Sequence, residues 1–197
     1  MIKNQNYNYN SLKNLLRGIL SEKRFKHSVN VSLVAEDLAK HYQIDSYKAK
    51  IAGLLHDICK EFSDEQNIKL ISEKECGVSF SQKILHGPAA SIYIQKEYGI
   101  TDEDLLNAVK YHTTGRKDMS LLEKIVFTAD YISPERKWKD LSLIRTLAYK
   151  DLDVAVLKKL STAILGCVMN HRCISENTLL AYNQLTEQMQ KMKKERE

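Results

Sequence analysis

Four histidines and two aspartates are of the types that bind metal ions, and all six lie in or beside apolar helical stretches. They are His27, His56, Asp57, His86, His112 and Asp130. A lone core-facing histidine is more often structural, but burying all six unpaired would cost several kcal/mol, which a shared metal offsets. Imidazole and carboxylate without thiolate suit iron, manganese, zinc, nickel or cobalt rather than calcium. The pattern predicts a dinuclear site, whose main use is hydrolysis of phosphate esters and anhydrides.

The His56-Asp57 pair closes the apolar stretch IAGLLHDICK. Neighbouring residues on a helix point about 100° apart, so a metal over the edge between them can take both side chains. A carboxylate can bridge two metals through its two oxygens, which an imidazole cannot do. We therefore expect Asp57 to bridge, the remaining histidines to divide between the metals, and Asp130 to complete one coordination sphere.

Three cations stand close in sequence to these candidates: Lys60, Arg116 and Arg136. A single lysine or arginine is more often a solvated surface charge, but recurrence beside three separate ligands favours contact with a phosphate held at the metals. With Asp57, these cations are our candidate catalytic residues. We expect the same cations and the turn at 113–115 (Thr113, Thr114 and Gly115) to bind substrate.

Helical periodicity runs through almost the whole chain and predicts an all-α, single-domain fold over 11–192. We expect a flexible N-terminus over 1–10 and a solvated charged tail over 193–197. His27 begins the core-facing stripe of a helix over 24–42. A buried helix over 45–58, capped by Asp45, carries His56 and Asp57. A capping box of Ser63 and Gln66 predicts the next helix, which ends near Gly77.

The second half of the chain places the other three candidate ligands near helix ends. We expect His86 just outside a helix that has Pro88 at its first position and ends at Gly99. A capping box of Thr101 and Asp104 then predicts a helix whose stripe ends at His112. A third box, at 120–123, starts the helix of Asp130, which ends at Pro134. Two further helices are expected at 140–170 and 175–192, with a possible break near 151.

Bulk composition fits a globular protein in the cytoplasm. The chain has 197 residues with 43 % apolar and 28 % charged residues, and only two prolines and seven glycines, which favours long helices. Its net charge of +5 suits an anionic partner or plain solubility. The four cysteines form no CxxC pair. The polar, Asn-rich start indicates no signal peptide, and no apolar run approaches transmembrane length, so we expect no membrane association.

The residues His27, His56-Asp57 and Asp130 resemble the H…HD…D pattern of the HD superfamily of metal-dependent phosphohydrolases. The segments RFKHS, GLLHDICK, ILHGPAA, YHTTGR and TADYISPER resemble the YqeK family of that superfamily, the symmetrical bis(5'-nucleosyl)-tetraphosphatases of bacteria. These segments span residues 24–136. Ser133 departs from the acidic residue that the family often has there, which bears on the substrate contacts rather than on the metal ligands.

This resemblance implies a helical HD fold, a di-iron-type centre, a homodimer and cleavage of diadenosine tetraphosphate into two ADP. It carries the family's metal ligands onto the six residues above, and its phosphate contacts onto Lys60, Arg116 and Arg136. The expected nucleophile is a water or hydroxide that bridges the two metals. ADP is a good leaving group, so no strong general acid is required.

Two alternatives stay open at this point. The same fold could hydrolyse another nucleotide, such as a nucleoside monophosphate or an alarmone, because the metals contact only a phosphate. The chain could instead be a non-catalytic helical module that binds nucleotides or RNA. Nucleic-acid binding does not explain six buried ligand-type residues, and no recognised nucleic-acid motif is present, so we expect no nucleic-acid partner.

Overall fold

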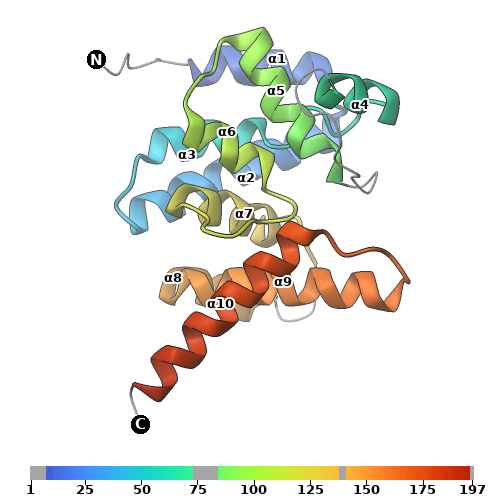
Figure 1. Cartoon of the computed structure of the whole chain (residues 1–197). Coiled ribbons are helices and arrows are strands. Elements are labelled where there is room, and N and C mark those ends of the chain that lie inside the picture. The colour runs from blue at the N-terminus through green and yellow to red at the C-terminus, as the bar shows by residue number, and fades with distance from the viewer. Residues whose placement is uncertain (1–7, 73–83, 138–140, 196–197) are drawn as a thin grey trace.

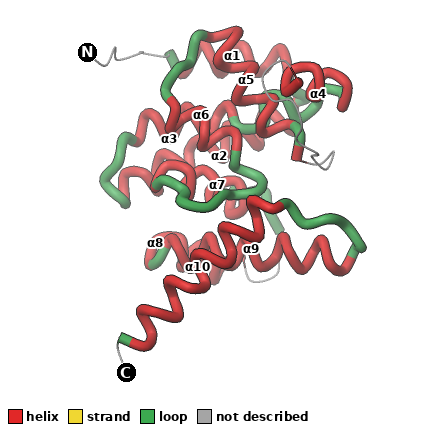
Figure 2. The backbone as a smooth tube through the Cα atoms, in the orientation of Figure 1, coloured by secondary structure: helices red, strands yellow, loops and turns green. Residues whose placement is uncertain are grey.

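A computed structural model describes residues 8–72, 84–137 and 141–195 of the chain. These residues form helices joined by turns and loops, with no strand among them (Figures 1 and 2). The helices are α1 (Tyr9–Ile19), α2 (Glu22–His41), α3 (Ser46–Leu55), α4 (Asp64–Ser72), α5 (His86–Tyr98), α6 (Glu103–Lys110), α7 (Leu121–Ile132), α8 (Leu141–Lys150), α9 (Leu152–Met169) and α10 (Glu176–Lys194). The all-α prediction is therefore confirmed.

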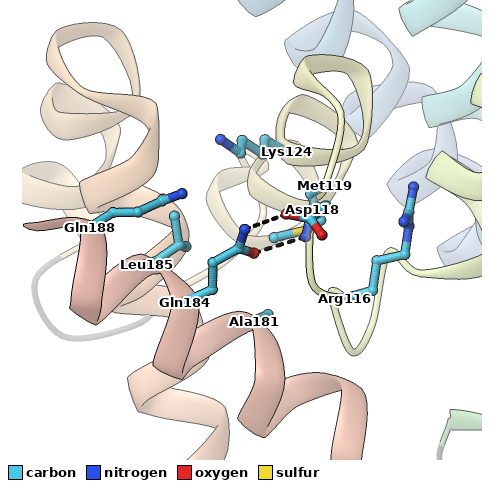
Figure 3. A pocket seen from close by; sticks show the side chains of 8 residues that line it. All are labelled: Arg116, Asp118, Met119, Lys124, Ala181, Gln184, Leu185 and Gln188. Carbon is cyan, nitrogen blue, oxygen red and sulfur yellow. Dashed lines mark hydrogen bonds between the residues drawn. The ribbon is translucent and has the colours of Figure 1, made fainter.

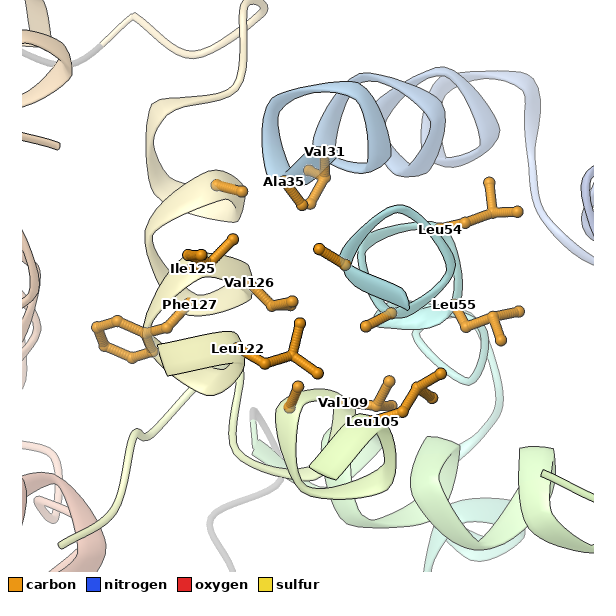
Figure 4. Close-up of a cluster of buried hydrophobic side chains, with 14 of the residues drawn as sticks. Val31, Ala35, Leu54, Leu55, Leu105, Val109, Leu122, Ile125, Val126 and Phe127 are labelled. Atoms are coloured by element: carbon orange, nitrogen blue, oxygen red, sulfur yellow. The ribbon is translucent and has the colours of Figure 1, made fainter. Parts of the chain in front are cut away.

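The core lies where α2, α3, α6 and α7 meet (Figure 4). Val31 and Ala35 of α2 and Leu54 and Leu55 of α3 all belong to it and are fully buried. Gly53 permits the close contact of these two helices, because a Cβ there would lie 2.9 Å from the Cα of Ser32. Apolar burial of this kind contributes about 25 cal/mol per Å² and holds the helix ends in fixed positions.

The C-terminal helices form a layer on one side of this core (Figure 1). α9 packs against α7, and α8 and α10 both pack against α9. Asp151 caps α9 by accepting a hydrogen bond from the backbone N–H of Val154, so the break expected near 151 separates two helices. None of the described helices has the length and apolar character needed to cross a membrane.

Several predicted helix boundaries are confirmed because they depend on neighbouring residues. Asp45 caps α3, and Gly99 ends α5 in the left-handed conformation with φ +63°. The expected boxes of Ser63 with Gln66 and of Ser120 with Glu123 are both formed.

Other boundaries were wrong. α1 begins at Tyr9, inside the segment predicted to be flexible, because the side chain of Asn8 caps it. Asp102, not Thr101, caps α6. α5 begins at His86 rather than at Pro88. At the other end of the chain α10 continues to Lys194, into the predicted tail. The expected helix end near Gly77 lies outside the described residues.

Two candidate ligands also sit differently from the prediction. α3 ends at Leu55, so His56 and Asp57 lie in the hydrogen-bonded turns that follow it rather than within the helix. His112 likewise follows the end of α6. In a turn, neighbouring side chains are not fixed about 100° apart as they are on a helix, so several of them can point to one place.

Candidate metal centre

Asp57 lies at the middle of a cluster of imidazoles. Its Oδ1 is 3.2 Å from Nε2 of His86 and 3.5 Å from Nε2 of His112. Its Oδ2 is 3.5 Å from Nε2 of His56 and 3.7 Å from Nε2 of His27. The two carboxylate oxygens therefore face two different pairs of histidines. All five side chains are at most 5 % exposed as residues.

Asp130 joins the cluster on the side of His27. Its Oδ1 lies 3.2 Å from Nε2 of His27. Ligand atoms of His27, His56 and Asp130 come within 4.8 Å of one another, and so do those of His56, Asp57 and His112. The structure thus brings all six residues singled out in the sequence into one place, from α2, α7, the start of α5 and the turns after α3 and α6.

Hydrogen bonds to the backbone set the orientation of two of these rings. Nδ1 of His56 donates to the carbonyl of Gly53 at 2.7 Å, and Nδ1 of His112 donates to the carbonyl of Val109 at 2.7 Å. The Nε2 atoms are then the ones free to coordinate. Within the described part of the chain, buried Nε2 of His56 has no hydrogen-bond partner. An unpartnered buried nitrogen facing two carboxylates fits a metal ligand.

Glu135 orients a third ring and was missed as a site residue. Its carboxylate accepts a hydrogen bond from Nδ1 of His27, and is itself held by Asn30 at 2.8 Å and Ser133 at 2.8 Å. A carboxylate behind a ligating histidine fixes its tautomer and raises its basicity. Its closeness to a candidate ligand could have identified it, because Glu135 follows Asp130 by five residues, in the segment ISPER.

Three of the four histidines have lowered pKa values, whereas the pKa of His27 is raised, because contacts with Asp130 and Glu135 outweigh the effect of its burial. Burial lowers the pKa of His56 to about 4, and burial also lowers the pKa values of His86 and His112. Burial by itself would raise the pKa of Asp57, but His56, His112 and His86 hold that pKa well below its usual range. Neutral imidazoles beside an ionised carboxylate can coordinate without first losing protons.

Glycine at position 87 allows two of the ligand-bearing segments to meet. A Cβ on Gly87 would lie 2.6 Å from the carbonyl oxygen of Lys110, and 3.6 Å from Cε1 of His112. Nε2 of His86 consequently reaches to 3.0 Å from Nε2 of His112. The start of α5 and the end of α6 are therefore in backbone contact beside the cluster.

Cations surround the cluster, and two of them were predicted. Nζ of Lys60 lies 3.2 Å from Nε2 of His86, and Nη2 of Arg136 lies 2.6 Å from Oδ1 of Asp130. Arg24 was missed, although it precedes His27 by one helical turn, and its Nη1 lies 3.3 Å from Oδ2 of Asp57. Lys159 was also missed. It comes from α9, and its Nζ lies 3.2 Å from Oδ2 of Asp130.

The turn after α6 places one hydroxyl at the centre. Oγ1 of Thr113 lies 3.0 Å from Nε2 of His112 and 3.3 Å from Nε2 of His86. Thr114 is directed elsewhere: its hydroxyl donates to the carbonyl of Gly115, and its own carbonyl accepts from Thr178 of α10 at 2.9 Å. Gly115 has φ +63°, which a residue with a side chain adopts at a cost.

Arg116 turns toward Glu123 rather than toward the cluster. Its Nε and Nη2 donate to the buried carboxylate of Glu123 at 2.7 and 2.6 Å. Figure 3 shows Arg116 at the edge of a pocket of about 260 Å³ between the 116–119 segment and α10. In this pocket the side-chain oxygen of Gln184 accepts from the backbone N–H of Asp118 at 2.8 Å. Proximity in sequence to His112 thus did not bring the guanidinium to the ligands.

Sequence comparison places these residues in a known domain. The HD domain matches residues 24–135, a range that contains all six cluster residues. Over 175 residues the chain is 41 % identical to the symmetrical bis(5'-nucleosyl)-tetraphosphatase of Halalkalibacterium halodurans, covering 87 % of this chain and 93 % of that protein. It is 34 % identical over 169 residues to the protein of the same name from Bacillus subtilis, covering 84 % and 91 %.

Structural comparison agrees. A crystal structure described as a predicted HD superfamily hydrolase involved in NAD metabolism, from Clostridium acetobutylicum, superposes with a TM-score of 0.89 at 38 % identity. The match covers 92 % of this chain and 98 % of the other. The similarity therefore includes the C-terminal helices as well as the HD domain.

Proposed function

The chain belongs to the HD-domain family, within it to the symmetrical bis(5'-nucleosyl)-tetraphosphatases, and from this premise we propose that it hydrolyses diadenosine tetraphosphate to two ADP. The observation that carries the proposal is the position of Asp57, whose two oxygens each face a separate pair of histidines. Such an arrangement suits a carboxylate shared between two metal ions.

We further propose that two metal ions bind, with His27 and Asp130 on one side of Asp57 and His86 and His112 on the other. His56 faces the side of His27 and has the unpartnered nitrogen. Bound there, the ions would supply Lewis-acid chemistry. The donor set of imidazole and carboxylate suits iron, our preferred metal, as well as manganese, cobalt, nickel or zinc.

The chain's own cations bind the polyphosphate in this proposal. Lys60, Arg136 and Arg24 carry positive charge on three separate segments around the cluster, so they can hold phosphoryl oxygens and stabilise the charge that develops on them. The side chains of Arg24 and Arg136 are 33 % and 28 % exposed, which leaves them accessible to a ligand. Thr113 offers a hydroxyl to the same space.

Arg116 keeps a more distant role in the proposal. Because Glu123 takes two of its donors, we assign it to a contact near the end of the polyphosphate and to fixing the turn that carries Thr113. Thr114 and Gly115 shape the backbone of that turn and contact substrate through it. The protein is proposed to act in the cytoplasm as a homodimer, with the nucleotide as its small-molecule partner.

Metal analysis joined to product analysis tests the function. Purified protein, loaded separately with iron, manganese, cobalt, nickel or zinc, is incubated with diadenosine tetraphosphate in heavy-oxygen water. We expect two metal equivalents per chain and ADP as the sole product, with one label for every two ADP formed. Early appearance of AMP with ATP would contradict the symmetrical cleavage.

A panel of other nucleotides decides between the remaining possibilities. Faster turnover of a nucleoside monophosphate or an alarmone would keep the hydrolase and change its substrate. Retention of nucleotide or RNA without metal and without turnover would instead identify a binding module. Sedimentation of the loaded protein tests the homodimer.

A further inference from the structure

A buried lysine from outside the HD domain touches the candidate centre from behind. Lys159 of α9 is 8 % exposed, and its ammonium lies within hydrogen-bond distance of three oxygens. These are the carbonyl of Phe127 at 2.6 Å, the carbonyl of His112 at 3.1 Å and Oδ2 of Asp130 at 3.2 Å. An ammonium has three hydrogens, so this set can satisfy all of them.

The three acceptors belong to the two segments that carry the last two candidate ligands. Phe127 and Asp130 lie on α7, whereas His112 lies in the turn after α6. The Phe127 ring packs under the same ammonium, with its centroid 3.8 Å from Nζ. Burying a lysine without partners is costly, and here every hydrogen has one. One buried charge therefore ties the turn of His112 to the helix of Asp130.

The two carboxylate oxygens of Asp130 contact different partners. Lys159 contacts Oδ2, whereas Oδ1 lies 2.6 Å from Nη2 of Arg136 and 3.2 Å from Nε2 of His27. The oxygen held by Lys159 is thus turned away from the histidine, and the other oxygen is the one next to it.

We propose that Lys159 is a positioning residue that holds Asp130 with Oδ1 directed to the side of His27, where the proposed metal ion would bind. The inference rests on the proposed metal centre and adds a requirement to it. It assigns a role to a residue beyond the 24–135 range of the HD domain. Lys159 touches neither substrate nor the reacting atoms in this role. It acts through the side chain of Asp130. Its contact with His112 is to the backbone carbonyl, and the ring of His112 stays oriented by the carbonyl of Val109.

The test compares Lys159→Met with the adjacent Lys158→Met. Methionine keeps the length and removes the charge, and Lys158 is an exposed lysine on the same helix. Metal-free protein is titrated with Mn²⁺ and then Zn²⁺. Loss of a supporting partner weakens metal affinity about 10–100-fold. We expect Lys159→Met to bind one equivalent of metal with the affinity of the unsubstituted protein, and the second equivalent about 10–100-fold more weakly. Its kcat should be reduced, and its KM should change little. Lys158→Met should match the unsubstituted protein.

A conservative variant separates positioning from folding. Lys159→Gln retains a hydrogen-bond donor and should recover part of the lost metal affinity. If Lys159→Met does not fold, Lys159→Gln becomes the deciding variant. A purely structural role would lower the melting temperature and weaken both equivalents alike. Equal weakening, or two equivalents bound with unchanged affinity, would overturn the inference while leaving the proposed function intact. An unsubstituted protein that binds no metal would overturn both.

Discussion

Gly87→Ala should damage the candidate centre although it changes no ligand. A Cβ at this position would lie 2.6 Å from the carbonyl oxygen of Lys110, and ordinary contact begins at 3.4 Å. The start of α5 must therefore move away from the end of α6 by about 0.8 Å, the difference between those two distances. The obstacle is a backbone atom, so no side-chain rotation can relieve it.

The size of the effect follows from the neighbours of this contact. His86 is adjacent to Gly87, and His112 follows Lys110 by two residues, so the displacement opens the 3.0 Å approach between their Nε2 atoms. Metal sites hold ligand distances to about 0.2 Å, and a misplacement of about 1 Å can cost 100-fold in rate. We expect about a 100-fold loss of kcat/KM with weakened binding of one metal equivalent.

The assay is metal titration of the metal-free protein followed by hydrolysis of diadenosine tetraphosphate. Gly166→Ala is the matched control, because a Cβ there meets nothing within 4 Å and alanine stabilises a helix by roughly 0.5–1 kcal/mol. Gly87→Ala with unchanged metal affinity and rate would refute the argument that backbone contact sets the distance between these two histidines.

Three further predictions concern the cluster itself. Asp57→Ala should abolish turnover and remove at least one metal equivalent by elemental analysis; full metal content would exclude a bridging role. Glu135→Gln should weaken metal binding about 10–100-fold in a titration, because the carboxylate orients His27, and unchanged affinity would remove it from the site. Burial lowers the pKa of His56 from 6.5 to about 4, so between these pH values the unfolded chain takes up a proton that the folded protein does not. In urea titrations, the metal-free protein should therefore lose up to about 3 kcal/mol of unfolding free energy as the pH falls across that window. The unfolding free energy of His56→Asn should depend less on pH over the same range.

The sequence was informative wherever the physical cause was local. Capping by Asp45 and by Ser120 with Glu123 depends on residues three apart, and both were predicted. The cap of α6 was misassigned because Thr101 and Asp102 both have suitable oxygens. Asp102 forms the cap, while Asp104 accepts a hydrogen bond from Ser120 instead. Which of two neighbouring residues caps a helix therefore depends on contacts with other parts of the fold, which the local sequence does not show.

The site was predictable in its ligand types but not in its supports. Six residues of metal-ligating type on apolar stretches are visible in the sequence because burial without a partner is costly. Supports that come from distant helices have no such signal. Lys159 is separated from Asp130 by a loop and a whole helix, and only the packing of α9 on α7 brings them together. Arg116 shows the opposite error, since it is near His112 in sequence yet is paired with Glu123.

The positions of these supports bear on the order in which the protein becomes competent during synthesis. The last candidate ligand, Asp130, is made well before Lys159, and Thr178 of α10, which holds the carbonyl of Thr114, is made later still. Chains grow at roughly 5–20 residues per second and fold from the N-terminus. A nascent chain that has just completed its ligands therefore lacks both supports. If the proposed metal ions bind at this cluster, we expect tight uptake only after the last two helices have emerged, because Lys159 and Thr178 lie on them.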